Sequence, residues 1–224
     1  NFSNTTFDTI QLNKILKKLK EKKIENVILE ASSHGLNQNR LDELKFDIGI
    51  FTNLTRDHLD YHKNFQNYFN LKFILFKKLL KKKSYAIYDD DLKISSNLNR
   101  ITKLNKIKKL TIGNKNSSCT IIDHQFLKDE QKITFKFKNN IYSFSTRLIG
   151  RVQIKNLLMA ILAALKSEIP LTKILKNLKK IRPVNGRLEK IGNLKNNGII
   201  ILDYAHTPDA LATCIKNVKE QFKL

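Results

Sequence analysis

The sequence predicts an α/β protein: a mostly parallel sheet flanked by helices, with a small antiparallel sheet appended to it. Two observations predict this class. Short apolar runs end abruptly in polar turns, as buried parallel strands do, and helical segments lie between those runs. Strand, turn and helix therefore alternate, which is typical of right-handed crossovers between parallel strands. The 224 residues suffice for one large domain or two small ones.

The first half of the chain contains three predicted strands and two predicted helices. Apolar residues at helical spacing predict an amphipathic helix that begins near Leu12 and ends in Lys22-Lys23. The strands are expected at 27–29, 46–51 and 85–88, and a long helix at about 64–83.

The second half contains an antiparallel hairpin, further helices and a linker. Residues 132–137 alternate apolar and polar, and after a turn residues 141–145 run back. The other elements are expected as helices at 154–166, 172–180 and 208–222 and strands at 187–191 and 198–202. Pro and Gly interrupt the periodicity at 183–186, which predicts a domain boundary near Arg182. We therefore expect one domain at 1–182 and the beginning of a second α/β domain at 183–224.

The net charge of +22, from 42 basic and 20 acidic residues, first suggests binding to nucleic acid or to an anionic surface. Only seven of the basic residues are Arg, and the lysines are spread over nearly every predicted helix. Nucleic-acid readers favour Arg forks and interleaved aromatic residues. We therefore favour compositional drift at solvated positions, and a basic, non-catalytic nucleic-acid-binding module is the alternative.

No segment has the pattern of a membrane span or of a secretory signal. The longest apolar run, at 157–165, is far shorter than the ~20 residues that a span needs. The two cysteines have no paired spacing, so a disulfide framework is not expected. We expect a cytoplasmic protein without membrane insertion. Because the sole methionine is Met159, we also expect the sequence to be a fragment or a processed product of a longer protein.

Acidic and imidazole side chains follow the predicted strands. Glu30 comes directly after the first strand, Asp57-His58 follow the second, and Asp89-Asp90-Asp91 follow the third. Ligands of open α/β sheets bind outside the carboxyl ends of the strands, where these groups could hold a hard cation. The alternative is that they are helix caps or turn residues, which suits the Asp run better than Glu30.

Two common site motifs are incomplete or absent. His58 and His62 have the i, i+4 spacing of a helical zinc pair, but no third ligand has convincing spacing, so zinc is not expected. Neither G-x-x-x-x-G-K-[ST] nor G-x-G-x-x-G occurs. A nucleotide site formed by this chain would therefore lack its phosphate-binding loop.

Lys72 lies in the middle of an apolar helical stripe, formed by Phe65, Tyr68, Phe69, Leu75, Phe76 and Leu79. The neighbouring lysines lie off that stripe. A lysine on a buried face must extend to solvent, form an ion pair or lose its charge. A neutral amine could react with carbon dioxide to give an anionic carbamate able to hold Mg²⁺, whereas extension to solvent is the commoner outcome.

Several motifs together resemble those of the Mur ligase family. Residues 30–40 resemble its E-x-S-S-H-G-L-x-Q-x-R signature, and the similarity continues in residues 51–62, Tyr68 and Lys72. Further on, Asn156, residues 186–189 and residues 203–211 agree in order and spacing. The resemblance covers nearly the whole chain and is weakest from about 92 to 146. Within the family it is greatest to the members that form the tripeptide of the peptidoglycan stem.

The resemblance implies an ATP-dependent acid–amino-acid ligase of the cell wall. Such an enzyme adds a third amino acid to UDP-N-acetylmuramoyl-L-alanyl-D-glutamate through an acyl phosphate, and neutralising the phosphoryl charge demands Mg²⁺. The amino acid is diaminopimelate or L-lysine, and diaminopimelate is the choice we expect. The chain would comprise most of the central ATP-binding domain and the start of the carboxyl-terminal domain. Alone, without the phosphate-binding loop, it is expected to be inactive.

The resemblance also implies roles for individual residues. Glu30 and His58 match Mg²⁺ ligands, and Lys72 matches the lysine that is carbamylated to serve the second Mg²⁺; these are also the expected catalytic residues. The residues expected to contact the UDP-linked substrate are Asn4, Thr5, Thr6, Ser32, Gln38 and Arg40. Those expected to contact the nucleotide are Asn156, Arg187 and Asp203.

Two positions depart from the family pattern. Val152-Gln153 replace the usual Phe-Asn, and Tyr88-Asp89-Asp90-Asp91 replace Asn-Ala-Asp-Asp, both beside the expected nucleotide site. A ligase of the same fold with another substrate, such as another Mur enzyme or a folylpolyglutamate synthetase, is a further alternative. The Ser-Ser-His-Gly-Leu run argues against it. We expect a monomer that binds no nucleic acid.

Overall fold

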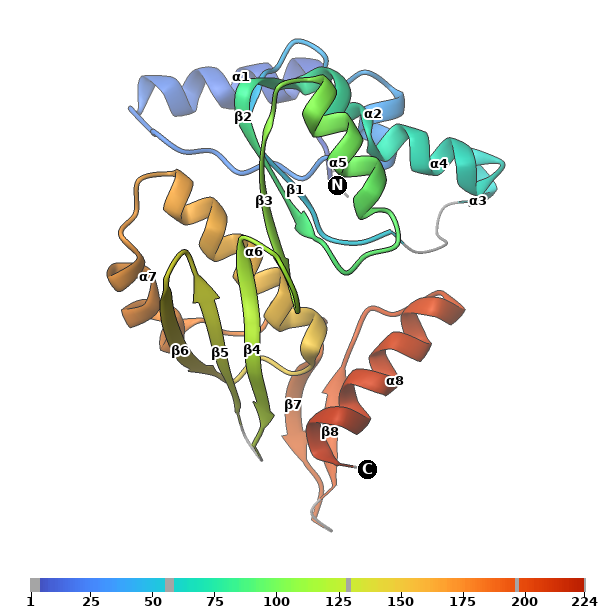
Figure 1. The fold of residues 1–224 in the computed structure, drawn as a ribbon. Coiled ribbons are helices and arrows are strands. Elements are labelled where there is room, and N and C mark those ends of the chain that lie inside the picture. The colour runs from blue at the N-terminus through green and yellow to red at the C-terminus, as the bar shows by residue number, and fades with distance from the viewer. Residues whose placement is uncertain (1–4, 55–58, 128–129, 196–197, 224) are drawn as a thin grey trace. The chain divides into compact units, whose positions relative to one another are not determined.

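The computed structural model describes residues 5–54, 59–127, 130–195 and 198–223 (Figure 1). A six-stranded sheet has the order β1-β2-β3-β4-β5-β6, and a separate two-stranded sheet pairs β7 with β8. The strands are β1 (Phe46–Phe51), β2 (Leu80–Asp89), β3 (Lys108–Gly113), β4 (Cys119–Phe126), β5 (Gln131–Phe137), β6 (Asn140–Thr146), β7 (Glu189–Asn193) and β8 (Ile199–Leu202). β3 and β4 are parallel, whereas β5 is antiparallel to both β4 and β6. The larger sheet is mostly parallel, as predicted.

The helices connect and flank these strands. They are α1 (Thr9–Glu21), α2 (Ser33–Asn37), α3 (Leu59–His62), α4 (Phe65–Lys72), α5 (Ser95–Leu104), α6 (Arg151–Lys166), α7 (Leu171–Asn177) and α8 (Pro208–Phe222). A π-helical turn, η1 (Leu75–Leu79), follows α4, and a 3-10 turn, η2 (Leu178–Lys180), follows α7. Within the described residues no helix is long and apolar enough to cross a membrane.

The chain divides into two compact units. Unit 1 contains residues 1–49, 58–86 and 96–109, and unit 2 contains residues 50–57, 87–95 and 110–224. The division passes through β1, β2 and β3, so these units are not sequence domains. The domain boundary near Arg182 stays a prediction.

Unit 1 has its apolar core between α1, α2 and η1. Leu12, Leu36, Leu41 and Leu79 are each at most 2% exposed and pack together. Asp8 begins α1, because its carboxylate accepts a hydrogen bond from the backbone N–H of Gln11. The core thus holds α1 and α2, which flank the segment that leads to Glu30.

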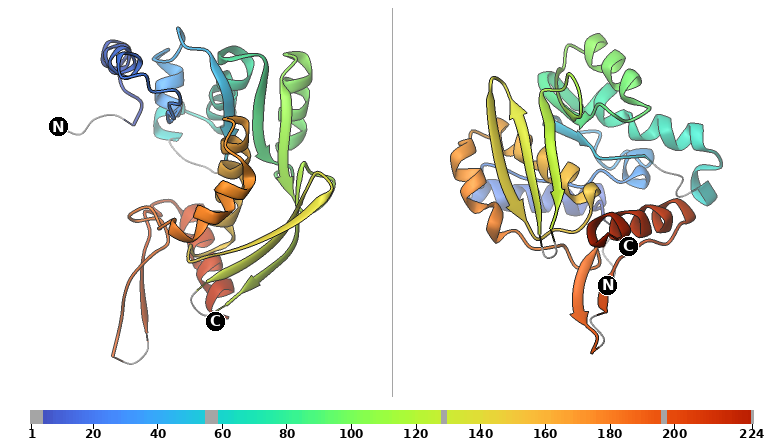
Figure 2. Two further views of the ribbon diagram at one scale, coloured as in Figure 1. Left: turned by 90° about the vertical axis from the view of Figure 1, so that its left-hand side faces the viewer. Right: turned by 60° about the horizontal axis from the view of Figure 1, so that its bottom comes forward.

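In unit 2, α6 and α7 lie on one face of β4, β5 and β6, as both views in Figure 2 show. The alternation of β5 buries Ile133 and Phe135, and α6 buries Ile154 and Leu158. The amino terminus of α6 is tied to α8, because the side-chain carbonyl of Asn217 accepts a hydrogen bond from the backbone N–H of Val152.

Most predicted elements are confirmed, some with shifted ends. The predicted first helix is α1, the strand at 46–51 is β1, and the hairpin is β5–β6. The helices near 154–166 and 208–222 are α6 and α8, and the strands near 187–191 and 198–202 are β7 and β8. The helix at 172–180 is divided between α7 and η2.

Two predictions were wrong. No strand is found at 27–29, where Ile28 is 96% exposed. A strand needs a hydrogen-bonded neighbour as well as an apolar sequence, and β1 is the first assigned strand of the sheet. The helix predicted at 64–83 ends at Leu79, and Leu80 begins β2. No Gly or Pro marks that change, so the sequence contains no breaker that could have revealed it.

Candidate functional site

Thr6 joins the amino-terminal segment to the residues around Glu30. Its side chain is buried, and its hydroxyl donates to the backbone carbonyl of Glu30 at 2.7 Å. The backbone N–H of Ser32 donates to the same hydroxyl at 3.0 Å. The Ser32 hydroxyl accepts a hydrogen bond from the backbone N–H of Gly35, so Ser32 is the N-cap of α2. Thr6 and Ser32, both expected substrate residues, are therefore adjacent, 2.9 Å apart between their hydroxyl oxygens.

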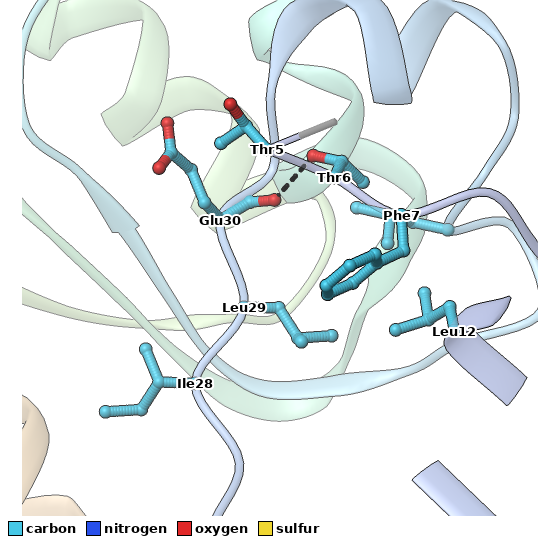
Figure 3. A pocket seen from close by; sticks show the side chains of 8 residues that line it. Thr5, Thr6, Phe7, Leu12, Ile28, Leu29 and Glu30 are labelled. Atoms are coloured by element: carbon cyan, nitrogen blue, oxygen red, sulfur yellow. Dashed lines mark hydrogen bonds between the residues drawn. The ribbon is translucent and has the colours of Figure 1, made fainter. Parts of the chain in front are cut away.

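A cavity of about 120 Å³ lies beside this junction (Figure 3). It is lined by Thr5, Thr6, Phe7, Leu12, Ile28, Leu29, Glu30 and Leu41. Phe7, Leu12 and Leu29 lie together on one side of it, and the Glu30 carboxylate and Thr5 hydroxyl lie on the other (Figure 3). The cavity thus has an apolar wall and a polar rim that contains three of the predicted site residues.

Arg40 is held by the same segment. Its Nη1 donates to the backbone carbonyl of Thr6 at 2.6 Å, and its Nε and Nη2 both donate to the side-chain carbonyl of Gln38. The guanidinium therefore lies within the network that also orients Thr6. Because a guanidinium has five N–H donors in a fixed plane, Arg40 retains donors for a carboxylate or a pyrophosphate.

Tyr61 extends the Gln38 and Arg40 group. Its hydroxyl accepts hydrogen bonds from the side-chain amides of Asn37, at 3.0 Å, and Gln38, at 3.2 Å. These hydrogen bonds, with the nearby charge of Arg40, lower the pKa of Tyr61. The ring lies 4.2 Å from that of His34. Sequence reasoning did not select Tyr61, although its position beside His62 in the matched motif was available.

A second group of contacts leads to Lys72. The Nε2 atom of buried His62 lies 2.9 Å from the buried Ser33 hydroxyl. The His62 ring stacks on the Tyr68 ring, with centroids 5.2 Å apart, and the Lys72 ammonium lies 5.6 Å from the centroid of Tyr68. Lys72 is half-buried at the end of α4, whereas Lys77 and Lys78 are exposed. Lys72 is thus less exposed than Lys77 and Lys78, and its place in a metal site stays a prediction.

The predicted metal ligands are only partly described. Asn4 and His58 lie outside the described residues, as do Asp57 and Arg56. Glu30 is exposed, and within the described part of the chain its carboxylate has no ion-pair partner. The described residues contain no cluster of three or more His, Cys, Asp or Glu side chains able to hold a metal. A free carboxylate on a cavity rim nevertheless fits a hard cation, for which oxygen ligands are preferred.

The Asp89-Asp90-Asp91 run forms a turn, as the cap-or-turn interpretation predicts, and also takes part in an ion pair that was not predicted. Asp89 is buried, and its Oδ2 accepts from the Lys155 ammonium at 2.5 Å. Asp89 Oδ1 accepts from the backbone N–H of Asp91, and the Asp91 carboxylate accepts from the amide of Asn114. These carboxylates therefore join the end of β2, the β3–β4 loop and α6.

The predicted nucleotide residues lie in unit 2. Both carboxylate oxygens of Asp203 accept backbone hydrogen bonds, from Leu188 at 2.8 Å and from Ala205 at 2.9 Å. The Arg187 guanidinium lies 5.3 Å from the Tyr204 ring centroid. On α6, Gln153 donates to the Arg187 carbonyl at 3.1 Å, one turn before the half-buried Asn156. The structure thus connects the Arg187–Asp203 segment with α6 through Gln153, whereas the contact of Asn156 with a nucleotide stays a prediction.

Both departures from the family pattern take part in these contacts. Gln153 makes the hydrogen bond to Arg187 just described. Tyr88 is fully buried, and Asp89 forms the ion pair with Lys155. Sequence reasoning did not identify Lys155, because a lysine in a chain so rich in lysine carries little signal.

The mostly parallel sheet with helical crossovers places the chain in the α/β class, and apart from Asn156 within α6 the described candidate residues lie in loops or at helix ends. Residues 1–164 match the family described as Mur ligase middle domain, and the chain belongs to the Mur ligase family.

Curated relatives extend the similarity along the chain. A protein of Rickettsia bellii is 38% identical over 218 residues, and one of Oceanobacillus iheyensis is 36% identical over 224 residues. Both are named UDP-N-acetylmuramoyl-L-alanyl-D-glutamate--2,6-diaminopimelate ligase. The matches cover 96% and 97% of this chain but 45% and 44% of the relatives. The chain thus spans less than half the length of the curated relatives it matches.

Solved structures agree on the fold. One described as the structure of UDP-N-acetylmuramoyl-L-alanyl-D-glutamate--2,6-diaminopimelate ligase has a TM-score of 0.80 and 28% identity, covering 96% of this chain and 44% of its own. MurC from Thermotoga maritima has a TM-score of 0.62 and 22% identity, covering 82% of this chain and 40% of its own. A structure of L. casei FPGS has a TM-score of 0.65 and 15% identity, covering 96% of this chain and 58% of its own. The last two show a shared fold alone.

Proposed function

We propose that the protein containing this chain is an ATP-dependent ligase that adds meso-2,6-diaminopimelate to UDP-N-acetylmuramoyl-L-alanyl-D-glutamate during peptidoglycan synthesis. The observation that carries the proposal is the 38% identity over 96% of the chain to a ligase with that name. The reaction has two steps. The γ-phosphoryl group of ATP passes to the side-chain carboxylate of D-glutamate and ADP leaves; the amine of diaminopimelate then attacks the acyl carbon and phosphate leaves.

The UDP-linked substrate is proposed to bind around the cavity in unit 1. Asn4, Thr5, Thr6, Ser32, Gln38 and Arg40 are assigned to it. The hydrogen bonds among Thr6, Ser32 and Arg40 support the assignment, since they hold these groups in one arrangement before the substrate arrives. Arg40 can pair with a carboxylate or pyrophosphate of the substrate.

Glu30, His58 and Lys72 are proposed to hold Mg²⁺, with Lys72 as a carbamate. The neutral Lys72 amine forms an N–C bond with carbon dioxide and releases a proton, giving an anion with two oxygen donors. Support comes from the half-buried position of Lys72 over Tyr68 and from the free carboxylate of Glu30. The bound cation supplies charge neutralisation for phosphoryl transfer.

ATP is proposed to contact Asn156, Arg187 and Asp203, with its phosphates held by residues outside this sequence. The grouping of Arg187 and Asp203 with α6 supports that assignment. We further propose that the enzyme works as a monomer in the cytoplasm, where its nucleotide-linked substrate would be met.

The test is a coupled assay of the complete protein. ADP release is measured with Mg²⁺-ATP, the UDP-linked dipeptide, and either meso-diaminopimelate or L-lysine, and the product mass is determined. We expect release that depends on diaminopimelate and a product carrying one added diaminopimelate residue. Ligation of L-lysine but not of diaminopimelate would overturn the proposal.

A further inference from the structure

A series of contacts connects Glu30 and Lys72, two of the proposed metal ligands, through a buried serine–histidine hydrogen bond. The backbone carbonyl of Glu30 accepts a hydrogen bond from the Thr6 hydroxyl, and the same hydroxyl accepts one from the backbone N–H of Ser32. Ser33, the next residue, contacts His62 through its hydroxyl. The contacts continue from His62 to Lys72 by way of Tyr68.

The Ser33–His62 hydrogen bond is the step that joins two separate stretches of chain. Ser33 begins α2, directly after the Glu30 segment, and His62 ends α3, four residues after the predicted ligand His58 and ten before Lys72. The two atoms are 2.9 Å apart, and the residues are 2% and 4% exposed. A buried polar pair of this kind favours one arrangement, since breaking it removes this hydrogen bond without replacing it by one to water.

Aromatic packing leaves His62 little freedom. Its ring stacks on Tyr68 with an interplanar angle of 25° and meets Tyr61 edge-on at 87°. The carbonyl of His62 accepts a hydrogen bond from the side-chain amide of Asn67, in the first turn of α4. The imidazole is therefore oriented from both sides, and α3 is fastened to α4, the helix that ends at Lys72.

We propose that His62 is a positioning residue: through its hydrogen bond to Ser33 it sets the Lys72 side chain relative to Glu30. This role differs from that of a zinc ligand, with which the i, i+4 spacing of His58 and His62 is compatible. The proposal rests on the assignment of Glu30 and Lys72 to the metal site under Proposed function.

The test measures Mn²⁺ affinity of the complete protein without substrates, by electron paramagnetic resonance of free Mn²⁺, together with the melting temperature. The variants are His62→Leu, Ser33→Ala, the double variant and His62→Gln. The first two should each raise the Mn²⁺ dissociation constant by about tenfold, the lower limit for residues that orient metal ligands. The double variant should bind Mn²⁺ no more weakly than the weaker-binding single variant. His62→Gln, whose amide can reach Ser33, should stay within about twofold of wild type.

Leu79→Ala is the matched control for a merely structural role. Leu79 lies in the neighbouring Leu12, Leu36 and Leu41 core and is 2% exposed. The Leu79→Ala variant should lower the melting temperature as much as His62→Leu does, and its Mn²⁺ dissociation constant should stay within about twofold of wild type. If His62→Leu does not fold, Ser33→Ala, which removes one hydroxyl oxygen, carries the test.

Wild-type Mn²⁺ affinity in Ser33→Ala or His62→Leu would overturn the proposal, as would an equal loss in Leu79→Ala or additive losses in the double variant. Wild-type protein that binds no Mn²⁺ would overturn it together with the metal site. The proposed function fails separately, because the amino acid that is ligated is measured in another assay. Ligation of L-lysine with the expected Mn²⁺ results would leave the role of His62 standing.

Discussion

The Lys155 ammonium on α6 binds the Asp89 carboxylate at the end of β2, at 2.5 Å. The Asp89 side chain is 3% exposed and that of Lys155 is 24% exposed. A second carboxylate, that of Asp91, lies 3.4 Å from the same ammonium. One lysine therefore neutralises two acids of the run that could, from sequence alone, have been taken for cation ligands.

Asp89→Asn should destabilise the protein by about 2 kcal/mol. The change leaves Lys155 without its main counter-charge in a largely buried position, where breaking a fully buried pair costs roughly 3–5 kcal/mol and partial exposure of Lys155 lowers that figure. Urea unfolding followed by circular dichroism measures the loss. Asp47→Asn is the control, because its exposed pair with Lys81 should contribute less than about 0.5 kcal/mol. Equal losses in the two variants would contradict the account.

The sequence predicted elements wherever a local pattern decided them. β1, α6 and the β5–β6 hairpin follow from the pattern of apolar and polar residues. Five elements of the described chain were not assigned: the short helices α2 and α3, and α5, β3 and β4 in the stretch where the family resemblance is weakest. In β4 the alternation is interrupted by a register shift between Ile121 and Asp123, so a two-residue period does not persist along the strand.

The candidate site was predictable by residue type but not by partner. Lys72 was selected because it breaks an apolar stripe, and that reasoning needs one helix only. The Ser33–His62 and Lys155–Asp89 contacts join residues 29 and 66 positions apart. No local pattern encodes such pairs. The strand prediction at 27–29 was wrong for the same reason, because the pairing of a strand depends on neighbouring strands that are distant in the sequence.

Gly150→Ala should destabilise the protein by about 2–3 kcal/mol. Gly150 has a φ of +84°, and an added Cβ would lie 2.7 Å from both Cβ and Oδ1 of Asn217. The displaced Asn217 would lose its hydrogen bond from Val152. Gly186→Ala separates the two causes, since Gly186 has a φ of +70° with open space around it and should cost only about 1 kcal/mol. Urea unfolding distinguishes the two variants, and equal effects would exclude the clash with Asn217.

Stability should fall as the pH is lowered through the titration range of His124. Burial is the main cause that lowers the pKa of His124 below 6.5, and the charge of Arg151 lowers it further. A hydrogen bond with Gln131 acts in the opposite direction and raises it. The unfolded chain therefore takes up the proton first, so stability is complete above about pH 6.5 and is lost as the pH falls toward the folded-state pKa. His124→Gln should lose less stability between pH 7 and about pH 5 than wild type. An unchanged pH dependence of the unfolding free energy in that variant would contradict the assignment.

Arg40→Lys should raise the KM for the UDP-linked dipeptide by about tenfold in the complete enzyme, with a smaller effect on kcat. A lysine cannot reproduce the planar set of bonds to Thr6 and Gln38, so the segment around the cavity would lose its orientation. The control is Arg100→Lys, an exposed arginine on α5. Steady-state kinetics at saturating ATP measure both the KM for the UDP-linked dipeptide and kcat. A wild-type KM in Arg40→Lys would show that Arg40 does not contribute to binding of the UDP-linked substrate.

Lys72→Ala should lower kcat by at least about 10²-fold in the complete enzyme, and added short carboxylic acids should restore part of the activity. The carbamate would supply two anionic oxygens, and a small carboxylate can occupy the space left by the truncated side chain. Lys77→Ala is the matched control, because Lys77 is exposed and five residues further along the same helical segment. Intact activity in Lys72→Ala would exclude the carbamate. Loss without any recovery, accompanied by an unchanged melting temperature, would instead indicate that Lys72 acts as a cation, since a carboxylic acid cannot replace an ammonium group.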